Sequence, residues 1–381
     1  MIRVGIRKQE LLAALGRQIS KTKENRHLTA VIDRPEDIFY YTRFWGEGIL
    51  IIKEKEESKL VVPRLEYLRA VNSSKECNII SSERGRGLID SILKFLGSND
   101  IVFYGGNDYW MANIIAKQVG KRNLVLGEDL VKKNREIKDK QEIETIKNAS
   151  NIIDELFEIA RKEIKINTSE EEIQSILVYE AMHRGARFPN YQFTSNPIIV
   201  ASGPNGSFPH AETSSRKIKN GDLVVLDITL SYDHYISDAT RTFGVGKISK
   251  RMQNVYNLVK QAQESAIERI RSTDNFADID LEGRKIIQEA GYGDFFIHST
   301  GHGIGLEVHE LPWIRPYTDT PIKENMTITI EPGVYIADKF GIRIEDSLCI
   351  TTKRNSREKI SKFDRYDSVN FHNFDKGLIV I

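Results

Sequence analysis

The sequence is poor in cysteine, with only Cys77 and Cys349 among its 381 residues. This number excludes a disulfide framework and a metal site built from cysteine thiolates. We interpret both residues as ordinary buried thiols.

Long hydrophobic runs are also missing. No uninterrupted apolar stretch reaches the roughly 18 residues that a transmembrane helix needs. Arg and Lys interrupt the apolar residues of the first twenty positions too often for a secretory signal. We therefore expect a cytoplasmic protein that does not associate with membranes.

The chain has no excess of charge of one sign, because 55 Lys and Arg residues stand against 54 Asp and Glu residues. A net charge of +1 gives no reason to expect a surface for nucleic acid or anionic lipid. A small molecule or a peptide is the expected partner.

The length favours two domains, although one large fold could also accommodate 381 residues. Strand-like and helical runs alternate in the first third of the chain, which indicates an α/β domain. The expected strands are 29–33, 48–53, 59–63, 101–105 and 123–127, and the expected helices are 85–97 and 109–119.

A charge-dense segment at 131–139 separates this region from the remainder of the chain. We assign residues 1–134 to the amino-terminal domain, 135–360 to a second domain and 361–381 to a carboxyl-terminal tail. Helical spacing in the second domain predicts helices at 140–163, 169–184, 250–271 and 276–290.

Two aspartates in the second domain lie on a predicted hairpin. Asp227 interrupts the apolar run LVVLDITL, and a carboxylate in a buried strand needs a compensating partner. Asp238 follows after the turn-like SYDH, so a hairpin would bring the two carboxylates onto opposed positions of neighbouring strands. The alternative for Asp238 is a simple ion pair with Arg241.

A second predicted hairpin contains two glutamates. Alternation in MTITIEPGVYI places Glu331 on a polar face, and GIRIEDSLCI places Arg343 and Glu345 together on the face opposite its apolar residues. Four convergent carboxylates would repel one another and raise each other's pKa unless positive charge lay among them. Two divalent cations would supply it.

Histidines complete the candidate set. His302 lies between glycines, which allow a close approach of backbone to a ligand, and His309 follows seven residues later. A purely structural role for His302 is the alternative. Carboxylates together with one imidazole suit manganese or cobalt, with iron and zinc as further candidates.

In these motifs the chain resembles the pita-bread metallopeptidases, especially the Xaa-Pro dipeptidases (prolidases) and aminopeptidase P. The five metal ligands of that family match Asp227 in VLDI, Asp238 in SDATRT, His302 in TGHGIGLEVHE, Glu331 in IEPGVY and Glu345 in RIED. Residues 140–352 carry most of the resemblance. The stretch DIFYYTRFWGEGILII is similar to the creatinase-type amino-terminal domain.

The resemblance implies a role for each matched residue. Asp238 and Glu345 would bridge two metal ions, Asp227 would bind one, and His302 with Glu331 would bind the other. Glu331 would also be the general base. His210 in NGSFPHAE and His309 would bind substrate and stabilise the tetrahedral intermediate, and Arg343 would receive the carboxyl side of the substrate. An ordinary loop histidine for His210 and a charge partner of Glu345 for Arg343 are the alternatives.

The implied function is metal-dependent cleavage of the Xaa-Pro bond in small peptides by a homodimer. The sequence does not separate the dipeptidase from the aminopeptidase, and a catalytically silent peptide- or protein-binding relative is a third reading. Thr229 and His234 stand where many relatives have glycine, which questions the turn geometry more than the catalysis.

Overall fold

The computed structural model describes residues 4–19, 27–127, 129–189, 196–352 and 365–381. The chain divides into two compact units, Met1–Arg135 and Glu136–Ile381. Residues 361–364, which begin the predicted tail, lie outside the described residues.

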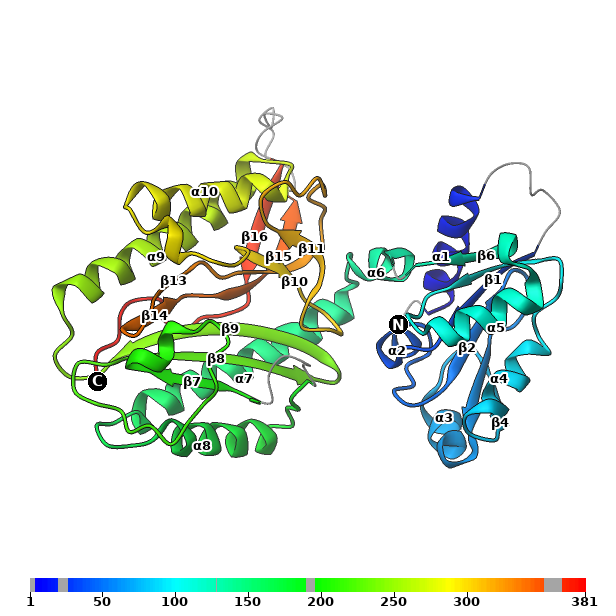
Figure 1. Cartoon of the computed structure of the whole chain (residues 1–381), viewed down its shortest axis with the longest axis horizontal. Coiled ribbons are helices and arrows are strands. Elements are labelled where there is room, and N and C mark those ends of the chain that lie inside the picture. Colours follow the sequence, from blue (N-terminus) through cyan, green and yellow to red (C-terminus); the bar gives the residue numbers. More distant parts are fainter. Residues whose placement is uncertain (1–3, 20–26, 128, 190–195, 353–364) are drawn as a thin grey trace. The chain divides into compact units, whose positions relative to one another are not determined.

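The first unit is built on one mixed sheet (Figure 1). β1 pairs in parallel with β5 and antiparallel with β2, so the centre of the sheet joins segments that are far apart in sequence. In spatial order the strands are β4 (Asn78–Ser82), β3 (Lys59–Pro63), β2 (Ile49–Lys53), β1 (His27–Ile32), β5 (Asp100–Tyr104) and β6 (Leu124–Leu126).

Helices pack on this sheet and bury its apolar residues. They are α1 (Val4–Gln18), α2 (Pro35–Thr42), α3 (Tyr67–Ser73), α4 (Arg86–Leu93), α5 (Tyr109–Val119) and α6 (Asp129–Arg135). The five predicted strands and two predicted helices of this region are present, each within a few residues of its expected bounds. The sequence pattern did not reveal β4, a half-exposed edge strand of sequence NIISS, or the helices α1, α2, α3 and α6.

The second unit contains three groups of paired strands within its described residues. One is the three-stranded sheet of β7 (Ile199–Ser202), β8 (Leu223–Tyr232) and β9 (Tyr235–Gly244). A five-stranded sheet has the order β11 (Glu310–Ile314), β10 (Gly301–Gly303), β12 (Thr327–Ile330), β15 (Asp346–Thr352) and β16 (Tyr366–Asn370). The third group is the pair β13 (Gly333–Ile336) and β14 (Phe340–Arg343).

Four helices flank these strands, with α7 and α8 on one side and α9 and α10 on the other (Figure 1). They are α7 (Lys140–Glu163), α8 (Glu170–His183), α9 (Lys250–Arg269) and α10 (Phe276–Glu289), within two residues of the predicted ranges. Asp139 begins α7 because its side chain accepts hydrogen bonds from the backbone N–H groups of Gln141 and Glu142. N–H groups in the first turn of a helix have no acceptor within the helix itself.

A two-residue turn closes the β8–β9 hairpin. Asp233 and His234 both have positive φ, of 43° and 70°, as the turn that matches the twist of antiparallel strands requires. The turn therefore forms without the glycine that many relatives have at position 234.

The second predicted hairpin is not a single continuous ladder. β12 pairs with β15 and β13 pairs with β14. Between these pairings, Glu331–Pro332 on one side and Ile344–Glu345 on the other lie outside the ladder. The prediction of one regular hairpin is corrected in this respect. Both glutamates lie where the ladder is broken, so the alternation of a strand does not decide on which face their side chains lie.

The carboxyl-terminal segment is part of the second unit. Residues Tyr366–Asn370 form β16, which pairs antiparallel with β15 from Leu348 to Thr352. The last residues return to β9, because Gly244 N donates to Ile379 O at 2.8 Å and Ile381 N donates to Gly244 O at 2.9 Å.

Within the described residues no helix is both long enough and apolar enough to cross a membrane. Cys349 is buried and Cys77 is half-buried, and both are free thiols.

Close packing of α9 against α10 yields a first prediction. A Cβ atom on Gly283 would lie 3.1 Å from Ala262 O and 3.4 Å from Ala266 Cβ. We expect Gly283→Leu to lower the free energy of unfolding by about 1–3 kcal/mol because it overfills this contact. Chemical denaturation measures the change, and Lys285→Leu on the exposed face of α10 is the control. Equal unfolding midpoints for the two variants would contradict the packing described.

Candidate metal centre

The β8–β9 hairpin carries the two aspartates on one face. Asp227 is paired with Thr240, and Asp238 with Thr229, so the aspartates are diagonal neighbours and not directly opposed as predicted. Diagonal neighbours on one face remain within reach of each other through a shared ligand. Thr229, which replaces a glycine of many relatives, donates its hydroxyl to Asp238 Oδ1 at 2.8 Å.

His302 lies at the centre of β10, where neighbouring backbone comes very close. A Cβ on Gly301 would lie 2.0 Å from Thr329 O, and one on Gly303 would lie 2.2 Å from Leu311 O. The flanking glycines therefore accommodate adjacent strands. Their role differs from the predicted one, which was a close approach of backbone to a ligand.

A buried ion pair holds the segment that leads to His302. Asp280 on α10 is fully buried and accepts two hydrogen bonds from Arg284, each of 2.8 Å. The Asp280 carboxylate also accepts from Thr300 Oγ1 at 2.7 Å and from Thr300 N at 3.1 Å. Arg284 in turn donates to His298 O at 2.9 Å. Sequence reasoning missed Asp280, because nothing in the pattern of a helix shows which loop its acid will anchor.

The backbone and a threonine fix the position of Glu345. Thr240 Oγ1 donates to Glu345 Oε2 at 2.7 Å, and Glu345 N donates to Thr240 O at 3.1 Å. Glu331 N donates to Thr300 O at 2.7 Å, which ties the second glutamate to the segment that precedes His302.

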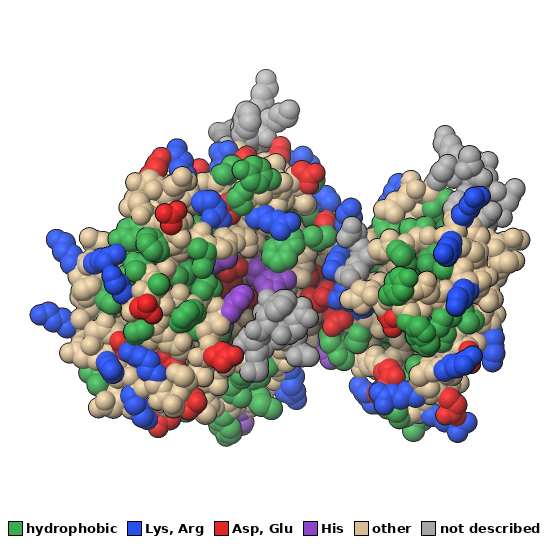
Figure 2. Space-filling view, viewed as in Figure 1, with side chains coloured by type: hydrophobic (Ala, Val, Ile, Leu, Met, Phe, Trp, Pro, Cys, Tyr) green, Lys and Arg blue, Asp and Glu red, His purple; other side chains and the backbone are tan. Residues whose placement is uncertain are grey.

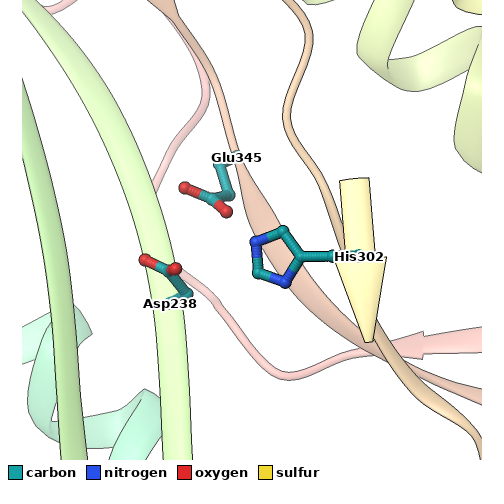
Figure 3. A group of neighbouring side chains, drawn as sticks. All are labelled: Asp238, His302 and Glu345. Carbon is teal, nitrogen blue, oxygen red and sulfur yellow. The ribbon is translucent and has the colours of Figure 1, made fainter. Parts of the chain in front are cut away.

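These elements bring three side chains together, as Figure 3 shows. Asp238, His302 and Glu345 point toward one another, and each offers a ligand atom within 4.8 Å of the others. Glu331 lies beside them, with Oε1 3.2 Å from His302 Nε2. Each of the four residues comes from a different part of the fold, on or next to β9, β10, β12 and β15.

Burial and mutual repulsion raise the pKa of two of the acids. Burial is the larger cause for Asp238, and the Asp227 carboxylate adds to it, so the pKa of Asp238 lies well above its usual range. The pKa of Glu345 is also raised well above its usual range, by burial and by Asp238, Glu331 and Asp227. The protein's own charges do not stabilise these two carboxylates in their ionised form.

Glu331 shows the opposite shift. Burial would raise its pKa, but the hydrogen bond and the positive charge of His302 outweigh burial and lower the pKa to about 2. For His302, burial lowers the pKa, but Glu331 and Asp238 together raise it above its usual value. In the metal-free protein the charges of Glu331 and His302 therefore stabilise each other.

Two carboxylate oxygens show that the residues fit a cation. Asp227 Oδ1 and Glu345 Oε1 are buried, and neither accepts a hydrogen bond from any residue that the structure describes. A buried carboxylate oxygen without a partner is costly. A metal ion bound between the acids would satisfy both atoms, and the oxygen-rich donor set suits a hard divalent cation.

Two simple ion pairs considered from the sequence are wrong. Arg241 pairs with Asp346 at 2.7 Å and not with Asp238. Arg343 pairs with Asp227, through Nη2 and Oδ2 at 2.5 Å, and not with Glu345. Arg343 is buried and also donates to Thr240 Oγ1 at 3.1 Å.

The two other predicted histidines lie near this centre. The His309 ring stacks on Trp313, with 5.5 Å between ring centroids, and meets the His302 ring edge-on at 4.3 Å. Burial and the positive charge of His302 lower the pKa of His309 to about 3. His210 is exposed on the loop that follows Gly203–Ser207, and its charge also contributes to the shift of His309. Figure 2 shows histidine side chains gathered in a hollow of the second unit, beside acidic side chains.

Sequence reasoning missed His298 and Tyr335. His298 Nε2 lies 3.0 Å from Tyr335 Oη, and that hydroxyl accepts a hydrogen bond of 2.5 Å from Arg343 Nη1. The His298 ring also lies 4.0 Å from Glu331 Oε2. The position of His298 four residues before His302 was the available signal, but only the fold turns its ring toward Glu331.

Comparisons with known proteins identify the family of this chain. Residues 144–352 match Metallopeptidase family M24, and residues 16–137 match the Creatinase/Prolidase N-terminal domain. An Xaa-Pro dipeptidase of Pyrococcus furiosus is 36% identical over 345 residues, which cover 90% of this chain and 95% of that protein.

Solved structures are similar over nearly the whole chain. The prolidase of Pyrococcus horikoshii has a TM-score of 0.85 at 29% identity and covers 98% of this chain and 99% of its own. An X-Pro aminopeptidase of Thermotoga maritima has a TM-score of 0.82 at 27% identity, with the same shares covered. These likenesses confirm the predicted fold class, a creatinase-like α/β domain followed by a catalytic domain of the pita-bread type.

The raised pKa of Asp238 predicts a pH-dependent stability. A carboxyl group whose folded-state pKa exceeds its unfolded value, about 4, destabilises the fold increasingly as the pH rises from that value through the raised pKa. In protein freed of metal with a chelator, we therefore expect Asp238→Asn to unfold at a higher temperature than the wild type at pH 7. This difference should disappear towards pH 4. Calorimetry measures it, with the exposed Asp319→Asn as control. A difference in unfolding temperature that stays constant between pH 4 and pH 8 would contradict the raised pKa of Asp238.

Proposed function

The chain belongs to metallopeptidase family M24, and we propose that it is an Xaa-Pro dipeptidase that hydrolyses the peptide bond before proline with two divalent cations. The observation that carries this proposal is the convergence of Asp238, His302 and Glu345 in a chain that is similar to an Xaa-Pro dipeptidase over 90% of its length.

In the proposed centre Asp238 and Glu345 would be shared by the two cations, Asp227 would hold one cation, and His302 with Glu331 would hold the other. The raised pKa values of Asp238 and Glu345 support their role as ligands, because bound cations would supply the positive charge that stabilises the carboxylates. The donor set favours Mn²⁺ or Co²⁺, with Zn²⁺ or Fe²⁺ as alternatives. When bound, the cations lower the pKa of water and polarise the scissile carbonyl.

Glu331 is the proposed general base. Its carboxylate lies beside the convergent side chains, with Oε1 3.2 Å from His302 Nε2, and can accept the proton of the attacking water. His298 and His302 lie on two sides of its carboxylate, at 4.0 Å and 3.2 Å, and hold it toward the centre.

Two histidines and an arginine bind the substrate in this proposal. A pKa of about 3 keeps His309 neutral at physiological pH, so its ring can donate a hydrogen bond to the developing oxyanion without adding charge. His210 serves the same substrate from its exposed loop. Arg343 receives the carboxylate of the dipeptide, and Asp227 and Tyr335 hold its guanidinium in place.

The proposed substrate is a small peptide with proline at the second position, and neither nucleic acid nor membrane takes part. The even charge balance supports this. We also propose a homodimer, which rests on the resemblance to the family, and separately a cytoplasmic location. Light scattering of the full chain at micromolar concentration tests the dimer.

An aminopeptidase that acts on longer Xaa-Pro peptides is the second candidate, because an X-Pro aminopeptidase is among the similar structures. A catalytically silent peptide-binding protein is the third. The convergence of Asp238, His302 and Glu345 disfavours this third candidate, since binding alone gives no reason to keep buried acids that repel one another.

A substrate panel tests the function. We expect a chelator to abolish hydrolysis of an Xaa-Pro dipeptide, and Mn²⁺ or Co²⁺ to restore it. The same assay with a longer Xaa-Pro peptide, a Met-Ala peptide and creatine distinguishes the candidate activities. Preference for the longer peptide would show that the chain is an Xaa-Pro aminopeptidase and not a dipeptidase. Full activity of the metal-free enzyme would refute the proposed mechanism.

A substitution of Glu331 tests the general base. We expect Glu331→Gln to lower kcat by a factor of about 100 or more, because the amide cannot accept the proton of water. Steady-state kinetics measures the loss, and the metal content of the variant shows whether metal binding is lost as well. Glu289→Gln at the exposed end of α10 is the control. Turnover equal to that of the control would exclude Glu331 as the base.

A further inference from the structure

A further buried carboxylate, Asp346, lies next to the candidate metal centre. Asp346 follows Glu345 in the sequence and is completely buried. Asp346 Oδ1 accepts from Arg241 Nη2 at 2.7 Å, and Oδ2 accepts from Gln263 Nε2 at 2.9 Å and from Asn370 Nδ2 at 2.9 Å. Lys376 Nζ lies 3.1 Å from the same Oδ2 atom. Asp346 is thus held by two cations and two amides.

Arg241 links this cluster to the backbone of the proposed ligand Glu345. Its guanidinium donates to Glu345 O at 2.7 Å and to Thr240 O at 3.0 Å. Thr240 is the residue whose hydroxyl binds the Glu345 carboxylate. The position of Arg241 therefore determines where both the backbone and the side chain of Glu345 lie.

The carboxyl-terminal segment supplies many of the remaining contacts. Arg241 donates to Phe374 O at 3.0 Å and to Asp375 O at 3.3 Å, while Asn370 and Lys376 contact Asp346 directly. These residues lie beyond residue 352, where the match to the metallopeptidase family ends.

Both ends of this segment are fixed. β16 is paired with β15, and the backbone of Ile379 and Ile381 is hydrogen-bonded to Gly244. Between these anchors the Phe374 ring packs against Phe157, with 5.2 Å between ring centroids, and Tyr256 Oη donates to Lys376 O at 3.1 Å. Lys376 therefore approaches Asp346 from a backbone that is held in place.

We propose that residues 366–381 form a positioning element of the metal centre, in which Lys376 and Asn370 hold Asp346 and Arg241 and thereby fix Glu345 for metal binding. The inference rests on the proposed function only in taking Glu345 as a metal ligand. Lys376 and Asn370 are positioning residues, because they act on Glu345 through Asp346 and Arg241.

Charge explains why Lys376 matters in addition to Arg241. A single arginine leaves Oδ2 of the buried Asp346 dependent on neutral amides, and an ionised carboxylate is costly in a buried position. Loss of Lys376 would draw Arg241 toward Asp346 and away from Glu345 O. The geometry of Glu345 would then be less well defined, and metal binding would weaken.

The test is Lys376→Met, which removes the ammonium group and keeps most of the unbranched apolar stem. Calorimetric titration of the chelator-treated full chain with Mn²⁺ measures the dissociation constant. We expect it to rise by a factor of about 10 or more, the effect usual for residues that orient metal ligands. Lys376→Arg should restore near-normal affinity, and Lys162→Met on the exposed end of α7 should leave it unchanged.

Thermal unfolding of the same variants separates positioning from general stability. A Lys376→Met protein that melts earlier but binds Mn²⁺ as tightly as the wild type while folded would overturn the inference. If this variant does not fold, Asn370→Ala provides the same titration, with the same expected and opposing results. A wild type that binds no Mn²⁺ would overturn the proposed function together with this inference, whereas binding by the wild type with unchanged affinity in the variants would overturn this inference alone.

Discussion

Carboxylates that are buried close together repel one another, and the second unit gathers such groups from separate elements of its fold. Arg343 compensates Asp227, and His302 compensates Glu331. Among the residues that the structure describes, no lysine or arginine forms an ion pair with Asp238 or Glu345, and the pKa of each is raised well above its usual range. The site therefore carries negative charge that the protein does not compensate, and a bound divalent cation would compensate it.

Threonine hydroxyls orient three of the four acids around this site. Thr229 donates to Asp238 and Thr240 donates to Glu345, while Thr329 Oγ1 lies 3.4 Å from Glu331 Oε1. Each hydroxyl binds one carboxylate oxygen, and in Glu345 the other oxygen, Oε1, accepts no hydrogen bond from a described residue and is left for a cation. A neutral donor fixes the side chain without cancelling the negative charge that attracts a cation, and β-branched threonine is also well suited to strands.

Much of this arrangement follows from local sequence pattern. Alternation and apolar runs placed the acid-bearing strands, and helical spacing placed α7 to α10 within two residues. Contacts between distant segments could not be predicted in the same way. The partner of Arg343 depends on how β14 lies against β8, and the role of Asp280 depends on which loop passes over α10. The break in the ladder at Glu331 and Glu345 likewise coincides with backbone hydrogen bonds to Thr300 and Thr240, which periodicity within one segment does not reveal.

The charges behind the site bear on its electrostatics as well as on its geometry. Asp346 adds another buried carboxylate next to Glu345, and if uncompensated it would add to the repulsion that already raises the pKa of Glu345. Arg241 and Lys376 lie against Asp346 and neutralise it locally, which lowers its pKa well below the usual range. The negative charge of Asp238 and Glu345 thus remains available to a cation. The neutralised Asp346 instead holds β15 in place. This division depends on a segment outside the matched catalytic region, so truncating the chain at residue 352 would remove part of the support of Glu345 along with a strand of the sheet.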